Sequence, residues 1–277
     1  MCSYCVDMNQ CKSGARLSLS LAALAFLGCK APSPGEGAAA SATSFKASAA
    51  PPVTAVTASA SASAAPSAPT CKEGSVLVPK GTYTRSDRGP TVKPAAVTIE
   101  AFCMDKTEVT TEAYAACVVS GKCTGADKGG FCNRDSSRTD HPINCVNWHQ
   151  AKAYCEAREQ RLPTEDEWEY GARGTDGRSF PWGSAKPTNQ LCWSRKGVAT
   201  CAVGSFPAGS SPFGLQDMAG NVLEWTSTEW AAKSQIYINR GGHWELDDEW
   251  SIRSTYRTKN SASINYYNIG FRCAGSL

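Results

Sequence analysis

The residues with the widest chemical scope in this chain are its cysteines, because thiolates bind soft metals, act as nucleophiles and form disulfides. The sequence has 277 residues and 14 cysteines, ten of them from Cys71 to Cys273 and none from 202 to 272. This density indicates an oxidising compartment rather than a reducing cytosol. An even number there favours five disulfides over a catalytic free thiol, although counting alone does not fix which cysteines pair.

Histidines and carboxylates offer fewer possibilities. The three histidines, His141, His149 and His243, show no close metal-ligand spacing. The acidic side chains of residues 245–249 could meet a cation or a basic ligand, or form a solvated loop. We find no Ser/His/Asp nucleophile motif and no phosphate-binding loop, so the sequence gives no support to a hydrolase or a kinase.

Composition excludes further classes. The chain carries 28 Lys and Arg against 25 Asp and Glu, a formal charge of +3 without a basic stripe, so we expect no nucleic-acid partner. Apolar residues make up 42% of the chain, enough for a folded core. No apolar run reaches the roughly 20 residues of a membrane-spanning helix.

The first 29 residues are typical of an export signal. The apolar run 17–28 follows Lys12 and Arg16 and ends directly before Cys29. Residues 26–29, Phe-Leu-Gly-Cys, resemble a bacterial lipobox, which predicts lipidation of Cys29. An ordinary secretory signal cut elsewhere is the alternative. We therefore expect an exported protein of the cell envelope, anchored by lipid to the outer membrane or facing the periplasm, with the membrane as one partner.

Residues 30–70 are predicted to be a disordered linker. Of the 40 residues from 31 to 70, 33 are Ala, Ser, Pro or Thr, and such side chains bury too little apolar surface to offset chain entropy. The folded part of the chain is therefore expected at 71–277.

Three helices are predicted within residues 71–277. Residues 147–160 place Trp148, Ala151 and Cys155 on one face. Thr164 and Glu167 form a capping box that predicts a second helix over 165–173. A third is predicted from Thr110 or Thr111 onward. The remainder, rich in Gly, Pro and Asn, indicates short strands joined by long loops in an irregular α+β domain.

Seven segments of the chain form an ordered series. They are Phe102–Thr110, His141–Trp148, Arg161–Tyr170, Phe180–Gly183, Phe213–Trp225, Arg240–Trp244 and Gly270–Cys273. In this order they resemble the formylglycine-generating enzyme (sulfatase-modifying factor) family. The resemblance covers about residues 74–275 and implies a single α+β domain, a variant of the C-type lectin-like fold with little regular secondary structure.

The resemblance also shows what this chain lacks. Aerobic members of the family oxidise a substrate cysteine to formylglycine with O2 and a copper(I) ion held by two thiolates. Those cysteines lie between the segments that match Arg240–Trp244 and Gly270–Cys273, where this chain has none. The acidic residues found there, Glu245 to Glu249, carry hard oxygens unsuited to copper(I). We therefore expect no copper centre.

A calcium site is implied instead. In the family, the segment that matches residues 217–224 holds a structural calcium ion through its first and last side chains and the backbone carbonyls between them. Asp217 and Glu224 would supply the carboxylates here, and Gly220 and Val222 the carbonyls, all hard oxygens suited to Ca2+. The alternative is that both carboxylates bind loop amides.

The family further implies one disulfide, Cys155 with Cys273. Closing a loop of more than 100 residues is worth about 4 kcal/mol in the chain-entropy model after a discount for strain. Cys192 and Cys201 are candidates for a local bridge. The remaining candidates are Cys117 with Cys123, Cys132 with Cys145, and Cys71 with Cys103.

Two functions remain. The first is a calcium-stabilised binding module in which a pocket recognises a peptide, a glycan or a protein. His243, Trp244, Arg257 and Asn268 are its candidate residues, with core packing and a hydrogen-bonded histidine as the alternatives. The second is an active family enzyme that modifies exported proteins through a non-standard centre, with His243, which stands where the family usually has Ser, as acid, base or ligand.

Overall fold

The structure is a computed structural model that describes residues 70–89, 92–134, 137–197 and 199–277. The predicted signal peptide 1–29, the predicted lipid site at Cys29 and linker residues 30–69 lie outside the described residues. No helix within the described ranges is both long and apolar enough to cross a membrane. The regular elements are β1 (Ser75–Val78), β2 (Gly81–Thr84), β3 (Ala96–Ile99), β4 (Phe102–Asp105), α1 (Thr111–Val119), α2 (Trp148–Ala157), α3 (Glu165–Arg173), η1 (Pro207–Gly209), β5 (Leu223–Glu229), β6 (Ile236–Arg240), η2 (Trp250–Ile252), β7 (Arg257–Ser261), β8 (Ile269–Gly270) and β9 (Ala274–Gly275).

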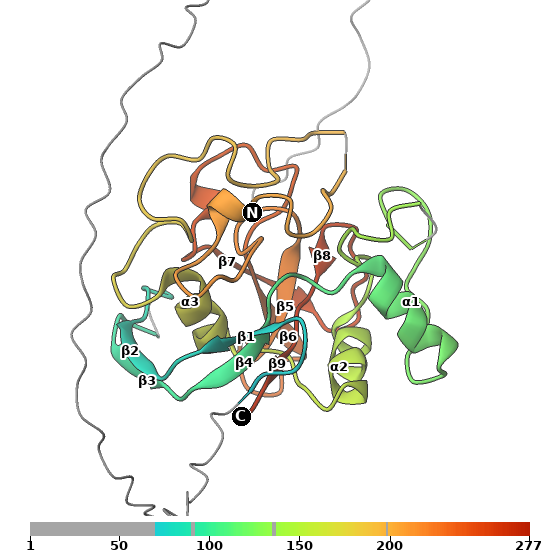
Figure 1. Cartoon of the computed structure of the whole chain (residues 1–277), viewed down its shortest axis with the longest axis horizontal. Coiled ribbons are helices and arrows are strands. Elements are labelled where there is room, and N and C mark those ends of the chain that lie inside the picture. The colour runs from blue at the N-terminus through green and yellow to red at the C-terminus, as the bar shows by residue number, and fades with distance from the viewer. Residues whose placement is uncertain (1–69, 90–91, 135–136, 198) are drawn as a thin grey trace, which may run out of the picture. The chain divides into compact units, whose positions relative to one another are not determined.

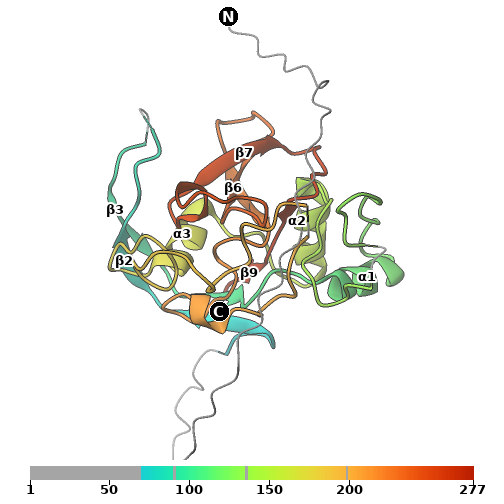
Figure 2. The ribbon, with the colours of Figure 1, turned by 90° about the horizontal axis from the view of Figure 1, so that it is seen from above.

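The strands form two small sheets and a separate hairpin. The strand order is β1-β4-β9 in one sheet and β7-β6-β5-β8 in the other, while β2 pairs with β3. Only the β5–β8 pair is parallel, with Leu223 opposite Ile269. Figures 1 and 2 both show α3 on one side of the strands and α1 and α2 on the other. The predicted α+β class is confirmed.

The helices begin where local side chains satisfy the first backbone amides. Thr164 accepts a hydrogen bond from the Glu167 amide at 3.1 Å, and the Glu167 carboxylate accepts one from the Thr164 amide at 2.8 Å. Asn147 and Gln150 form the same reciprocal pair at the start of α2. Thr110 caps α1. All three predicted helices are confirmed, and α3 has the predicted bounds.

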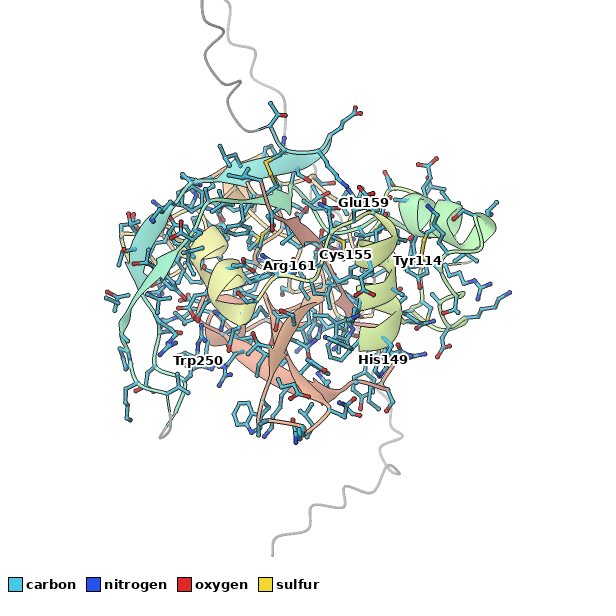
Figure 3. All side chains as sticks on the ribbon, turned by 90° about the horizontal axis from the view of Figure 1, so that it is seen from below. Tyr114, His149, Cys155, Glu159, Arg161 and Trp250 are labelled. Atoms are coloured by element: carbon cyan, nitrogen blue, oxygen red, sulfur yellow. A yellow bond between two sulfur atoms is a disulfide. The ribbon has the colours of Figure 1, made fainter. Side chains whose placement is uncertain are left out.

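Aromatic side chains fill the core between these elements. Between α1 and α2, the rings of Tyr114 and Tyr154 stack with centroids 5.5 Å apart, and Phe271 packs against both. Figure 3 shows α1 and α2 side by side, with Tyr114 and Cys155 labelled on them. On the side of α3, Trp168 packs within a second buried cluster. The helices thus hold both sheets in fixed positions.

All ten cysteines of the described residues form disulfides, in the pairs that the sequence left as candidates. The bridge that the family implies joins α2 to the end of the chain across 118 residues. The five pairs are Cys71–Cys103, Cys117–Cys123, Cys132–Cys145, Cys155–Cys273 and Cys192–Cys201.

The segment between α3 and β5 has only one short helical turn, η1, among its described residues. It runs as the yellow and orange loops of Figure 1, above α3 and β5 in that view. This accounts for the low content of regular structure expected from the sequence. Its last residues, 217–222, lead directly into β5, and together with Leu223 and Glu224 they form the candidate calcium loop, 217–224.

Candidate functional site

The loop before β5 has a backbone that only particular residues allow. Asp217, Gly220 and Asn221 have φ angles of 57°, 80° and 55°, in the left-handed region. A Cβ atom on Gly220 would lie 2.4 Å from the carbonyl oxygen of Cys192, so glycine is required there. The Asn221 amide donates to the same carbonyl at 2.8 Å, and the Asn221 side chain accepts from the Cys201 amide at 3.0 Å. The Cys192–Cys201 disulfide loop therefore supports the candidate calcium loop.

Glu224, at the far end of this loop, is fully buried. Its Oε1 accepts from Arg272 Nη2 at 2.7 Å, and its Oε2 accepts from Arg272 Nε at 2.7 Å and from Trp168 Nε1 at 2.8 Å. An ionised carboxylate offers about four lone-pair positions. Three of them are used here, so one position on Oε1 remains available to a further ligand.

Asp217 and Glu108 lie within the same buried group. Asp217 accepts a hydrogen bond from the Gly204 amide at 2.6 Å. Burial raises the pKa of Asp217, and the neighbouring Glu224 raises it further. Burial, followed by repulsion from Asp217 and Glu224, raises the pKa of Glu108 well above its usual range. Burial is the larger cause of both shifts, and repulsion between the carboxylates adds to it.

Glu108 was not among the predicted site residues. Its Oε2 accepts a long hydrogen bond of 3.3 Å from the Asn221 side chain, and its Oε1 is buried without a partner among the described residues. A buried unpaired carboxylate oxygen is costly and points to an additional ligand or a bound proton. The sequence signal was its place in the segment Phe102–Thr110, which supported only the family resemblance.

The charges of this group fit a divalent cation. Glu108, Asp217 and Glu224 carry three negative charges when ionised, and Arg272 supplies one positive charge, which leaves two uncompensated. No three or more His, Cys, Asp or Glu side chains of the described residues are placed to hold a metal on their own. A calcium ion would therefore need backbone carbonyls of the loop as ligands in addition to the carboxylates, which is the ligand set that the family resemblance implies. A proton shared between Glu108 and Asp217 would relieve part of the same charge.

His243 and Trp244 lie in an aromatic cluster beside this loop. The Trp244 ring is fully buried, and its centroid is 5.7 Å from Tyr267 and 6.4 Å from Phe131. His243 Nδ1 and Trp244 Nε1 are both buried without a hydrogen-bond partner within the described ranges. Burial lowers the pKa of His243, and the nearby Glu245 opposes that shift.

Asn268 belongs to the same part of the fold, because its carbonyl accepts from the Leu223 amide at the start of β5. Arg257 has different partners. Its guanidinium donates two hydrogen bonds to Glu165 on α3, at 2.8 and 3.1 Å, and lies over the Trp230 ring at 4.8 Å. His243 and Trp244 thus lie in one aromatic cluster with Tyr267, the neighbour of Asn268 in the chain, whereas Arg257 contacts Glu165 on α3 and Trp230.

The acidic side chains of residues 245–249 each have their own partner. Glu245 accepts from the Tyr267 hydroxyl at 3.0 Å, and Asp247 pairs with Lys196 at 2.5 Å. Asp248 accepts from the amide and hydroxyl of Ser251 at the start of η2. Their carboxylates do not converge on one point. Of the two alternatives from the sequence, these contacts favour a solvated loop over a cation site.

The fold and the site define a disulfide-rich α+β domain that has a loop suited to calcium and no free thiol among the residues described. The sulfatase-modifying factor enzyme 1-like domain matches residues 60–277 of the chain. The chain therefore belongs to this family.

The chain is similar both to a protein described as inactive and to proteins described as formylglycine-generating enzymes. The inactive C-alpha-formylglycine-generating enzyme 2 of Bos taurus is 36% identical over 156 residues, which cover 50% of this chain and 51% of that protein. The formylglycine-generating enzyme of Mycobacterium tuberculosis (strain ATCC 25618 / H37Rv) is 42% identical over 120 residues, 37% of this chain and 40% of that protein. The chain thus matches about half the length of such relatives or less.

A solved structure supports the fold. PvdO from Pseudomonas aeruginosa superposes with a TM-score of 0.62 and 25% identity, over 73% of this chain and 94% of that one. CarF superposes with a TM-score of 0.57 at 21% identity, which shows a shared fold alone. The fold expected from the family resemblance is thus confirmed.

Proposed function

We propose that this protein is an exported, lipid-anchored binding module of the formylglycine-generating enzyme family that lacks the copper oxidase centre. One observation carries the proposal: all ten cysteines from Cys71 to Cys273 are in disulfides, and the interval 202–272, where the family holds copper, has no cysteine. No thiolate pair is left among the described residues for copper(I).

The cluster of His243, Trp244, Tyr267 and Asn268 is the binding site of this proposal. His243 is partly exposed, and its ring would meet polar groups of a peptide, a glycan or a protein. Trp244 is fully buried and would support that contact from within the fold. The Tyr267 ring is 38% exposed and offers an aromatic surface beside them. The four residues would thus give orientation through hydrogen bonds and affinity through apolar contact.

Calcium has a structural role in this proposal. Asp217, Glu224 and the carbonyls of Gly220 and Val222 would hold it, and Glu108 would contribute to the negative charge. When bound, the ion neutralises buried carboxylates that would otherwise repel one another. The chain's own residues keep the loop in place through the Cys192–Cys201 bridge and the Glu224–Arg272 pair.

An active enzyme with a non-standard centre is the alternative, and one observation favours it. His243 is the candidate general base, because its Nδ1 has no partner within the described residues. Such a role would require His243 to reach a proton of a bound substrate.

One experiment separates the two functions. The exported full chain is purified, its metals are quantified, and it is incubated with cysteine-containing peptides under O2 before mass spectrometry. One calcium per chain, no redox metal and no change in peptide mass are expected. Copper or iron at the same stoichiometry, together with an aldehyde product, would contradict the binding-module proposal. The lipid anchor is tested separately. A Cys29→Ser variant should no longer be found in the membrane fraction.

A further inference from the structure

Strand β7 lies at the edge of the larger sheet, next to β6 only. Figure 2 shows it at the outer margin of the domain. The Ala262 amide donates to the Gln235 carbonyl at 2.8 Å, in register with the β6–β7 ladder. Because antiparallel ladders alternate, Asn260 directs its backbone groups toward β6, whereas Arg257 and Lys259 direct theirs outward. Within the described part of the chain, these outward amides and carbonyls have no hydrogen-bond partner.

Cationic side chains lie along the same edge. Lys259 Nζ lies 3.8 Å from the centroid of the Trp230 ring, and the Arg257 guanidinium lies over that ring at 4.8 Å. Arg257 is neutralised by Glu165, but no carboxylate of the described residues pairs with Lys259. The exposed Trp230 therefore holds an uncompensated ammonium group in place beside the open backbone of β7.

A pocket continues this edge toward η2. Its volume is about 320 Å³, and Asp87, Trp250, Tyr256 and Arg257 are among its lining residues. Trp250 is 63% exposed and is labelled at the margin of the domain in Figure 3. The Arg253 guanidinium lies over the Trp250 ring at 5.7 Å, and no carboxylate of the described residues pairs with it. A second uncompensated cation thus stands at the other end of the edge.

From these contacts we infer that the open edge of β7 binds an extended, acidic segment of a partner protein by adding it as a further strand. The main chain of the segment would pair with the outward amides and carbonyls of Arg257 and Lys259. Its carboxylates would meet Lys259 at one end and Arg253 at the other, and one side chain would enter the pocket beside Trp250. This surface is separate from the His243 cluster, so the inference does not depend on that site.

The positive charge of Lys259 favours an acidic strand over a second copy of this chain as the partner of β7. In a symmetric antiparallel pair centred on Lys259, each ammonium group would lie opposite its counterpart, and like charges in that position are destabilising. Lysine on an edge strand also discourages neutral strands from pairing. A strand with glutamate or aspartate at alternate positions removes both penalties.

The test uses the full chain and a synthetic peptide of four Glu-Thr repeats. Its controls are a Gln-Thr peptide and a Glu-Thr peptide with a central proline, which cannot complete the strand pairing. We expect the Glu-Thr peptide to bind more tightly than either control and less tightly as salt is added. In hydrogen exchange, it should protect the amides of Arg257 and Lys259, while those of Thr258 and Asn260 are already protected by β6.

Lys259→Glu should weaken this binding by about tenfold or more, because an attraction becomes a repulsion. Lys259→Gln should weaken it less, and Lys122→Glu, an exposed control position on another face of the fold, should leave it unchanged. Equal binding of the proline peptide, or binding without protection of the Arg257 and Lys259 amides, would overturn the inference. So would Lys259-dependent binding of polygalacturonate or anionic vesicles in place of the peptide, or self-association of the chain through β7.

Discussion

Arg272 and Glu224 form a bidentate ion pair in which neither side chain is exposed to solvent. Arg272 also donates to the carbonyls of Asp105, Lys106 and Gln216, so one guanidinium joins β4, the candidate calcium loop and β5. The ion pair therefore organises the site and does not serve as a reactive group.

Replacing Arg272 with Met should lower the free energy of unfolding by about 3 to 5 kcal/mol, because it leaves Glu224 buried without its charge partner while keeping most of the side-chain volume. Urea denaturation measures the change. The control is Lys152→Ala, which removes an exposed pair with Glu156 on α2 and should cost under about 1 kcal/mol. Similar losses for the two variants would contradict the prediction.

The calcium proposal predicts a thermal response that depends on Asp217. Addition of EGTA should lower the melting temperature of the wild-type chain, since a ligand that binds only the folded state stabilises it. Asp217→Ala should lose this response. Asp176→Ala removes an exposed carboxylate that pairs with Arg178, and this variant should keep it. A wild-type melting temperature that is the same with calcium and with EGTA would remove calcium from the proposed function.

The buried carboxylate of Glu169 should make the free energy of unfolding depend on pH. Burial alone would raise its pKa, but attraction to Arg240 and hydrogen bonding with Arg88 outweigh burial and lower the pKa to about 2. The unfolded chain therefore binds this proton first as the pH falls. The stabilisation is complete above the ordinary carboxyl pKa of 4.5 and is lost between there and about pH 2.

This contribution amounts to about 3 kcal/mol. Chemical denaturation at a series of pH values checks it, with Glu169→Gln as the comparison. The variant should be less stable at neutral pH and should show a smaller loss of stability in acid. If wild type and variant lose stability in parallel below pH 4.5, the acid dependence comes from other carboxyl groups.

The contribution of each disulfide to the free energy of unfolding should depend on the length of the loop that it closes. Changing Cys155 and Cys273 to Ser opens a loop of 118 residues and should cost about 5 kcal/mol in the chain-entropy model. Changing Cys117 and Cys123 to Ser opens one of 6 residues and should cost about 2 kcal/mol. Thermal unfolding of the two double variants gives the order, and a larger loss for the short loop would refute it.

Local features of the fold could be predicted closely from the sequence. The Thr164–Glu167 capping box fixed the first residue of α3, because it involves side chains only three residues apart. The strands were harder to place. The parallel pairing of β5 with β8 joins Leu223 to Ile269, and no turn between them signals it. Such long-range pairing depends on packing of the whole domain.

The candidate site shows the same limit. Glu108 and Asp217 are 109 positions apart, yet their carboxylates repel one another inside the fold. No spacing rule could have joined them. Arg257 is only 14 positions from His243, but β7 carries its side chain to Glu165 and Trp230. Arg257 was predicted to share a pocket with His243, whereas the course of β7 brings it to Glu165 and Trp230.

The bridge between Cys71 and Cys103 gives the domain a mechanical property. Cys71 precedes the first strand, and Cys103 lies in β4, the central strand of its sheet. A pulling force applied through the chain before Cys71 would pass along the covalent bond into β4 and would not peel β1 from the sheet edge. A tether attached on that side would therefore load the central strand of this sheet together with its edge strand.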